Sequence, residues 1–139
     1  MTKPVKPKRT KNYGVPESPY LFQKRNQAGV HLLADFWFGK NIEDEKKLEK
    51  ILIQAGKKSK STPLKTSIYK FNPHGITGIL LLAESHIAIH SWPEIGYLGV
   101  DIFTCGENTQ PQKALEYLKK KFFPKICEIK EIKRGVWKE

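Results

Sequence analysis

The chain has 139 residues, of which 39% are hydrophobic, so it is long enough for one domain with a substantial core. No stretch reaches the roughly 18 continuous apolar residues that a membrane-spanning helix needs, and the basic N-terminus lacks the apolar region of a secretory signal. Two cysteines, Cys105 and Cys127, do not make a disulfide framework, so we expect a reduced chain in the cytoplasm.

The net charge of +11 raises nucleic acid as a partner. Much of this charge lies in residues 1–27, which are rich in Pro and Lys and show no apolar period. We predict that they form a basic N-terminal extension before a single domain at 28–139. The rest of the chain mixes Lys with Glu, as solvated surfaces do, and no basic run is interleaved with aromatic residues. A nucleic-acid-binding module therefore stays a less favoured alternative.

The first two predicted elements are a strand and a helix. Residues 30–38 alternate between apolar side chains, ending at Phe38, and a more mixed set, which predicts a strand with one buried face. Residues 41–56 predict a helix, because apolar residues recur every three or four positions and acidic residues fill the first turn. We expect Asn41 to cap its N-terminus and Gly56 to take the left-handed position after its last turn.

Five strands and a second helix are predicted beyond that point. The strands alternate or are rich in β-branched residues, and the helix has Pro111 at its first position and an apolar stripe. The resulting order, β-α-β-β-β-β-α-β, predicts an α+β two-layer sandwich, an antiparallel sheet with two helices packed on one face and the other face left to solvent or a partner. The predicted strands are 62–71, 76–84, 86–92, 97–105 and a short strand within 125–135, and the helix is 109–123.

The sequence LLAESHIAIHSWPE at residues 81–94 concentrates side chains that can react. Ser85 lies outside the G-x-S-x-G pattern of hydrolases, and nothing in the sequence supplies the acid and histidine of a protease triad. His86 and His90 would lie about 13 Å apart on a strand, too far for one metal ion, so no metal site is predicted. Cys105 fits either a small buried residue or a nucleophile paired with His90.

A longer stretch, GILLLAESHIAIHSWPEIGYLGVDIFTCGE, closely resembles the prokaryotic S-adenosylmethionine decarboxylases, short pyruvoyl-dependent enzymes of spermidine synthesis. The resemblance runs from about residue 29 to residue 135 and includes HLLADFWF, FNPHGITG, the motif E-S-H-x-x-x-H-x-W-P-E and F-T-C-G. It implies a proenzyme in which the Ser85 hydroxyl attacks the Glu84 carbonyl and the chain breaks through an ester. Residue 85 would then become a pyruvoyl group, and the products would be a β chain, 1–84, and an α chain, 85–139.

The resemblance also implies roles for other residues. The pyruvoyl ketone would form a Schiff base with the amine of S-adenosylmethionine and accept the electrons released as carbon dioxide leaves. Cys105 matches the family's proton donor, and His90 matches the base that assists processing. Thr77 stands where the family usually has a serine that assists processing, and it keeps the hydroxyl group. His86 matches the motif in a positional role, and His31 is interpreted as structural.

Two substrate contacts follow from the same resemblance. Glu94 fits a carboxylate that accepts hydrogen bonds from ribose hydroxyls, and Phe71 fits a ring that stacks on adenine, although Phe71 also fits a core residue of its strand. We expect a dimer of processed αβ protomers with sites near the subunit interface. Some archaeal proteins on this scaffold decarboxylate arginine, an alternative that Glu94 and Phe71 disfavour. Simple alternation places Ser85 and His90 on opposite faces of a strand, so the sequence leaves open how they meet.

Overall fold

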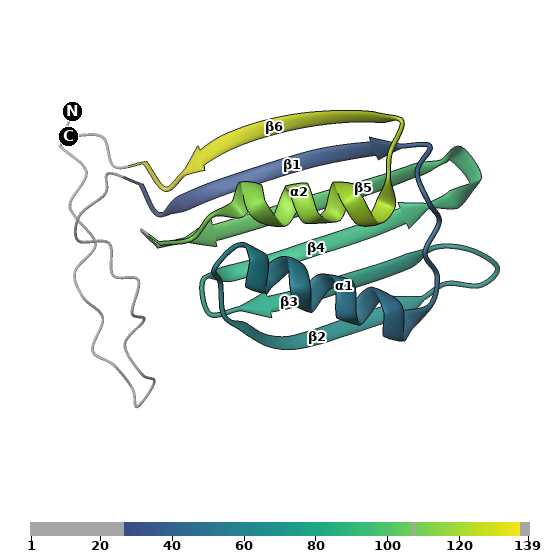
Figure 1. Ribbon diagram of the computed structural model, residues 1–139, viewed down its shortest axis with the longest axis horizontal. Helices are drawn as coiled ribbons and strands as arrows, with labels where there is room; N and C mark the ends of the chain where they lie inside the picture. The colour runs from purple at the N-terminus through teal and green to yellow at the C-terminus, as the bar shows by residue number, and fades with distance from the viewer. Residues whose placement is uncertain (1–26, 107, 137–139) are drawn as a thin grey trace, which may run out of the picture.

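The computed structural model describes residues 27–106 and 108–136. They form a six-stranded antiparallel sheet in the order β2-β3-β4-β5-β1-β6, with two α-helices side by side on one face (Figure 1). The predicted α+β two-layer sandwich is confirmed. The strands are β1 Gly29–Trp37, β2 Pro63–Lys70, β3 Ile76–Leu82, β4 Ser85–Trp92, β5 Tyr97–Cys105 and β6 Ile126–Arg134, the helices are α1 Glu45–Lys58 and α2 Pro111–Phe122, and a short 3₁₀ helix, η1, spans Pro93–Ile95.

The core lies between the sheet and the two helices. Alternation along each central strand turns one set of apolar side chains towards the helices, and Ile87 and Ile102 are fully buried there. From the other side, α1 contributes a buried stripe that includes Leu48 and Leu52. A Cβ at Gly78 of β3 would come within 2.9 Å of the Leu52 side chain, so the helix packs directly against the strand backbone.

The start of α1 differs from the prediction, because Asn41 is not its N-cap. Asp44 has the extended backbone of a cap, and its carboxylate accepts a hydrogen bond from the Lys47 backbone N–H at 2.9 Å. Glu43, predicted in the first turn, instead accepts a hydrogen bond from the Gly75 backbone N–H at 2.8 Å. This bond to the β2–β3 connection keeps residues 41–43 out of the helix.

The end of α1 and the end of β1 also differ from the prediction. Gly56 lies buried inside α1, which continues to Lys58 and is capped by Ser59. Glycine is needed there because a Cβ would come within 2.8 Å of the Leu80 side chain. Phe38, predicted on the buried face, has a φ of 57° and is 53% exposed, so β1 ends one residue earlier.

The C-terminal strand β6 is an edge strand that pairs only with β1 among the described strands. It spans nearly all of the predicted segment. Residues spaced by three fall on alternating faces of a strand, so Ile126 and Ile132 share one face and Ile129 lies on the other, and each is about half exposed.

The N-terminal region carries a prediction that the structure leaves untested. Residues 1–26 lie outside the described part of the chain, so the basic extension predicted for residues 1–27 stays a prediction. Among residues 27–106 and 108–136, neither helix has the length and apolar character required to cross a membrane.

The face of the sheet opposite the helices, which we call the open face, carries no helix among the described residues (Figure 1). The strand register shows which side chains share this face, because directly paired residues of antiparallel strands point the same way. It includes Thr77, Ile79 and Leu81 of β3, His86, Ala88 and His90 of β4, Asp101 and Phe103 of β5, and His31 and Leu33 of β1.

Candidate active site

The tight turn between β3 and β4 holds Glu84 and Ser85 from several directions. The Glu84 side chain is buried, and its carboxylate accepts hydrogen bonds from the backbone N–H of Thr62 at 2.6 and 3.1 Å. Ser85 has a φ of 141°, a conformation that residues with a Cβ rarely adopt and that costs on the order of 1–3 kcal/mol. The peptide bond that joins these residues therefore lies in a buried and strained turn.

Both groups that a self-cleavage would use have hydrogen-bond partners in this turn. The Glu84 carbonyl oxygen accepts a hydrogen bond from the Cys105 backbone N–H at 3.0 Å. The Ser85 hydroxyl lies 2.8 Å from His86 Nδ1. A donor on the carbonyl and an acceptor on the hydroxyl are what nucleophilic attack on an amide requires, since negative charge develops on the oxygen and the hydroxyl loses its proton.

Thr104 lies directly across the β4–β5 pair from Ser85. Its side chain is 1% exposed, and its hydroxyl has no hydrogen-bond partner among the described residues. An unpaired buried hydroxyl is unusual and costs stability. A hydrogen-bond donor without an acceptor, placed beside Ser85, fits a site in which that residue becomes a carbonyl-bearing pyruvoyl group.

Cys105 ends β5 at the same end of the sheet and is half-buried. Burial raises the pKa of its thiol above the ordinary value of 9.0, and the nearby Glu84 carboxylate raises it further. The thiol therefore keeps its proton at neutral pH. This protonation state suits the predicted proton donor and does not suit a thiolate nucleophile.

A second group of predicted residues lies at the other end of the open face. Thr77 and His90 are directly paired across β3 and β4, and the Thr77 hydroxyl is hydrogen-bonded to His90 Nδ1. The His90 ring centroid lies 5.6 Å from that of Phe71 and 4.0 Å from that of Trp92. Phe71 is 41% exposed, so it is available to a ligand and is not the core residue that alternation also allowed.

The structure thus divides the predicted site residues into two groups. Glu94 belongs with the second group, because it is exposed in η1, which follows the last residue of β4. His90 lies five positions after Ser85 along the strand, which corresponds to about 16 Å. The register also places Ser85 on the helix side and His90 on the open face, as alternation predicts. One protomer does not bring the two groups together.

Sequence reasoning gave little weight to His86 and His31, which the structure places beside the Ser85 turn. His31 Nε2 lies 2.9 Å from an Asp101 carboxylate oxygen, and its ring centroid lies 6.4 Å from that of His86. Phe103 contacts both rings, with centroids 5.3 Å from His31 and 6.0 Å from His86. Only the pairing of β1 with β5 brings His31 here, and no sequence signal that we used specifies that pairing.

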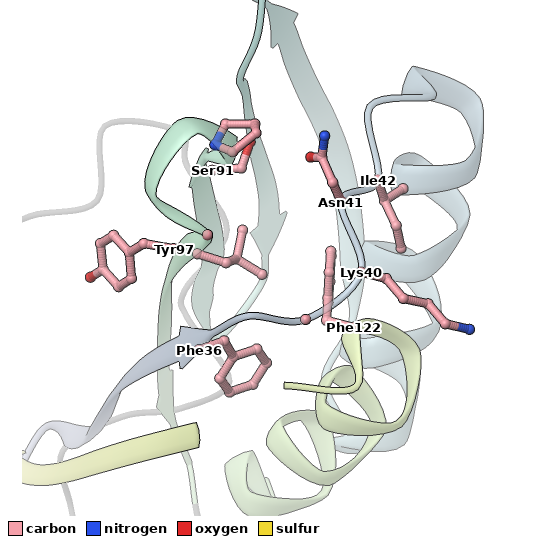
Figure 2. A pocket seen from close by; sticks show the side chains of 11 residues that line it. Phe36, Lys40, Asn41, Ile42, Ser91, Tyr97 and Phe122 are labelled. Atoms are coloured by element: carbon pink, nitrogen blue, oxygen red, sulfur yellow. The ribbon is translucent and has the colours of Figure 1, made fainter. Parts of the chain in front are cut away.

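A small cavity of about 80 Å³ lies near the other end of β4, away from Ser85. Figure 2 shows residues from the 39–42 segment, from β4 and from the end of α2 gathered around it. One of them, Ser91, uses its hydroxyl to accept a hydrogen bond from the Ile76 backbone N–H at 3.0 Å. Neither Ser85 nor Cys105 lines this cavity, so the cavity is separate from the β3–β4 turn that contains Glu84 and Ser85.

Comparison with known proteins gives a consistent family. The family model described as S-adenosylmethionine decarboxylase matches residues 30–135. The chain is 38% identical over 112 residues to the S-adenosylmethionine decarboxylase proenzyme of Methanococcus maripaludis strain S2, covering 79% of this chain and 92% of that protein. It is 41% identical over 113 residues to the proenzyme of Thermodesulfovibrio yellowstonii, covering 78% and 82%.

A solved structure agrees with these relatives. The crystal structure of the adenosylmethionine decarboxylase from Aquifex aeolicus VF5 superposes with a TM-score of 0.74 at 36% identity, over 81% of this chain and 95% of that one. The family model, the sequence relatives and the fold agree, and the chain belongs to the S-adenosylmethionine decarboxylase family.

Proposed function

We propose that this member of the family is made as a proenzyme that cleaves itself between Glu84 and Ser85 and then decarboxylates S-adenosylmethionine. One observation carries the first half of this proposal. The Glu84–Ser85 bond lies in a strained turn where the Glu84 carbonyl accepts a hydrogen bond from Cys105 and the Ser85 hydroxyl contacts His86 Nδ1. In such a turn the carbonyl is polarised by a donor and the hydroxyl lies beside an acceptor, as transfer of the Glu84 acyl group from nitrogen to Ser85 Oγ requires.

The cleavage balances without an oxidant or a reductant. Ser85 Oγ bonds to the Glu84 carbonyl carbon as the amide C–N bond breaks, which gives an ester and a free amine at residue 85. Loss of the α-proton of residue 85 then breaks its Cβ–O bond and releases the Glu84 carboxylate on the β chain. Water replaces the nitrogen of the resulting dehydroalanine, ammonia leaves, and a pyruvoyl group remains at the start of the α chain.

The decarboxylation would use residues from both groups. The pyruvoyl group supplies an electron sink for the bond that releases carbon dioxide. The protonated Cys105 thiol beside it can return a proton to the α-carbon. The exposed Phe71 ring can stack on adenine, and the exposed Glu94 carboxylate can accept hydrogen bonds from the ribose. These two contacts favour S-adenosylmethionine over arginine, which has neither group.

The separation of the two groups supports a dimer in which each site is shared. The open face exposes apolar side chains that a monomer would leave in water, including Leu81 and Trp92. A two-fold axis that lies between two open faces and runs perpendicular to the strands would place the end of β4 near Ser85 in one protomer over the end near His90 in its partner. S-adenosylmethionine would then lie between the two sheets. A cytoplasmic location, in keeping with two free cysteines, is part of the same proposal.

Intact-mass analysis of the purified protein tests the self-cleavage. The wild-type chain of 16.0 kDa should yield two fragments that join at residues 84 and 85, with the second blocked at its N-terminus and able to form a borohydride-reducible adduct with an amine. Ser85→Ala should remain a single chain. A wild-type protein that stays whole after long incubation and carries no reactive carbonyl would exclude the proposal.

A further inference from the structure

We propose that His86 is the general base that removes the hydroxyl proton of Ser85 in the first step of self-cleavage. The inference rests on the proposed self-cleavage and assigns that step to a residue for which the sequence suggested only a positional role. His86 touches the reacting atom, because its Nδ1 lies 2.8 Å from Ser85 Oγ. Contact at this distance is what a general base requires.

The His86 ring is held in place by its neighbours on the open face. Phe103 meets it edge to face, with an interplanar angle of 80°, and His31 meets it at 73°. His31 is itself held by Asp101 at 2.9 Å. The side chain paired with His86 on β3 is the apolar Leu81. The ring therefore cannot swing far from Ser85 without breaking these contacts.

The charges around His86 favour the neutral ring that a base must present. The groups that face it are His31 from β1, Asp101 from β5 and Arg134 from β6. Burial lowers the pKa of His86 below its ordinary value of 6.5, His31 and Arg134 lower it further, and Asp101 opposes them. At neutral pH the ring is unprotonated, so Nδ1 can accept the Ser85 hydroxyl hydrogen while Nε2 carries the ring proton.

Self-cleavage contains two proton removals of different kinds, and the structure offers a separate histidine for each. The first takes the hydroxyl proton of Ser85, and the second takes its α-proton once the ester has formed. His90 is engaged by Thr77 and lies about 16 Å along β4. His86 thus serves the first step within its own protomer and passes the proton to the departing amide nitrogen. His90 serves the second step from the partner subunit.

Two variants of His86 test this assignment. His86→Ala removes the acceptor, whereas His86→Asn keeps a hydrogen-bond acceptor at a similar position but cannot take a proton. The conversion of precursor to two chains is followed by gel and mass after cell-free synthesis. Both variants should convert about 100-fold more slowly than the wild type, while His74→Asn, at an exposed histidine in the β2–β3 connection, should convert at the wild-type rate. Circular dichroism checks that each variant folds.

Hydroxylamine, which cleaves esters, separates the two steps. Neither His86 variant should accumulate a hydroxylamine-sensitive chain, whereas His90→Ala should accumulate one. The wild-type rate should fall on acidification with a midpoint below pH 6.5, because protonation removes the base. The assignment would be overturned if His86→Ala converted at the wild-type rate or if His86→Asn restored that rate. Accumulation of an ester in either variant would also overturn it. An uncleaved wild-type chain would instead overturn the proposed function on which it rests.

Discussion

The backbone N–H of Cys105 donates a hydrogen bond to the carbonyl oxygen of Glu84 at 3.0 Å. Cys105 therefore acts on the β3–β4 turn, which contains Glu84 and Ser85, through both its backbone and its side chain. Its backbone polarises the carbonyl that Ser85 would attack, and its side chain supplies a protonated thiol at the same end of the sheet. Because substitution changes only the side chain, the two contributions can be separated by experiment.

Cys105→Ala should still cleave itself but should lose most of its decarboxylation. The backbone donor to Glu84 remains in this variant, whereas the proton donor is gone, and loss of such a group typically costs about 100-fold or more. Intact mass reports the cleavage, and release of labelled carbon dioxide reports the turnover. Cys127→Ala is the matched control, since Cys127 lies on β6 away from the turn. Unchanged turnover in Cys105→Ala would remove the thiol from the reaction.

Decarboxylation should persist to higher pH than an ordinary thiol would allow. In the proposed reaction the protonated form of Cys105 donates the proton, and burial and Glu84 raise the pKa of this thiol above 9.0. Turnover therefore stays constant as pH rises towards that value and falls only when the thiol ionises beyond it. A pH profile of kcat measures this fall in turnover at high pH. A decline centred well below pH 9.0 would contradict the raised pKa.

Removing the Glu84 charge should lower the pKa of the Cys105 thiol. The Glu84 carboxylate is the second cause of the raised pKa, after burial, so Glu84→Gln should make alkylation of Cys105 by iodoacetamide begin at lower pH. The measurement uses precursors that also carry Ser85→Ala, which prevents cleavage, and Cys127→Ser, which leaves one thiol. An identical alkylation profile with and without Glu84→Gln would show that the charge does not act on the thiol.

Thr104→Val should stabilise the precursor and slow its cleavage. The Thr104 hydroxyl is buried without a partner among the described residues, and replacing it with a methyl group should add about 1 kcal/mol to the free energy of unfolding. Denaturant unfolding of Ser85→Ala with and without Thr104→Val measures this gain. The same change in the cleavable chain should reduce the rate of conversion. Lower stability together with normal cleavage would show that the hydroxyl is structural.

If each active site combines residues from two protomers, two variants that are each inactive should restore activity when they form a mixed dimer. Cys105→Ala damages the group of site residues around Ser85, and Glu94→Gln damages the group around His90. When the two variants are co-expressed with different tags, each mixed dimer contains one undamaged site, and the mixture should recover up to about a quarter of the wild-type activity. Sites built within single protomers would give no recovery. Light scattering establishes whether the variants form dimers.

The sequence was enough to predict the layers of this fold, because period-two alternation and amphipathic helices report directly on burial. It misplaced the ends of α1, since those depend on contacts with distant residues. Glu43 bonds to Gly75, and the Leu80 side chain excludes a Cβ at Gly56, so neither residue behaves as its local sequence suggests. Such contacts arise only once β3 lies under the helix.

The candidate site residues were predicted from a family motif, which does not predict how they are arranged in space. Alternation places Ser85 and His90 on opposite faces of a strand, but the sequence left open whether one chain could bring them together. The contacts of Glu84 with Thr62 and Cys105, and of His31 with Asp101, depend on the pairing order of six strands. No local pattern encodes that order, because β1 enters the sheet between the last two strands of the chain.

Because of this strand order, folding of the cut protein would require two separate chains to associate. The β chain would contain β1, α1, β2 and β3, and the α chain β4, β5, α2 and β6, with β1 inserted between β5 and β6. Neither product can form the sheet alone, so unfolding would release two separate molecules. Thermal stability would then rise with protein concentration, and recovery from denaturant would be a second-order association. The uncut Ser85→Ala chain would refold at a rate independent of concentration.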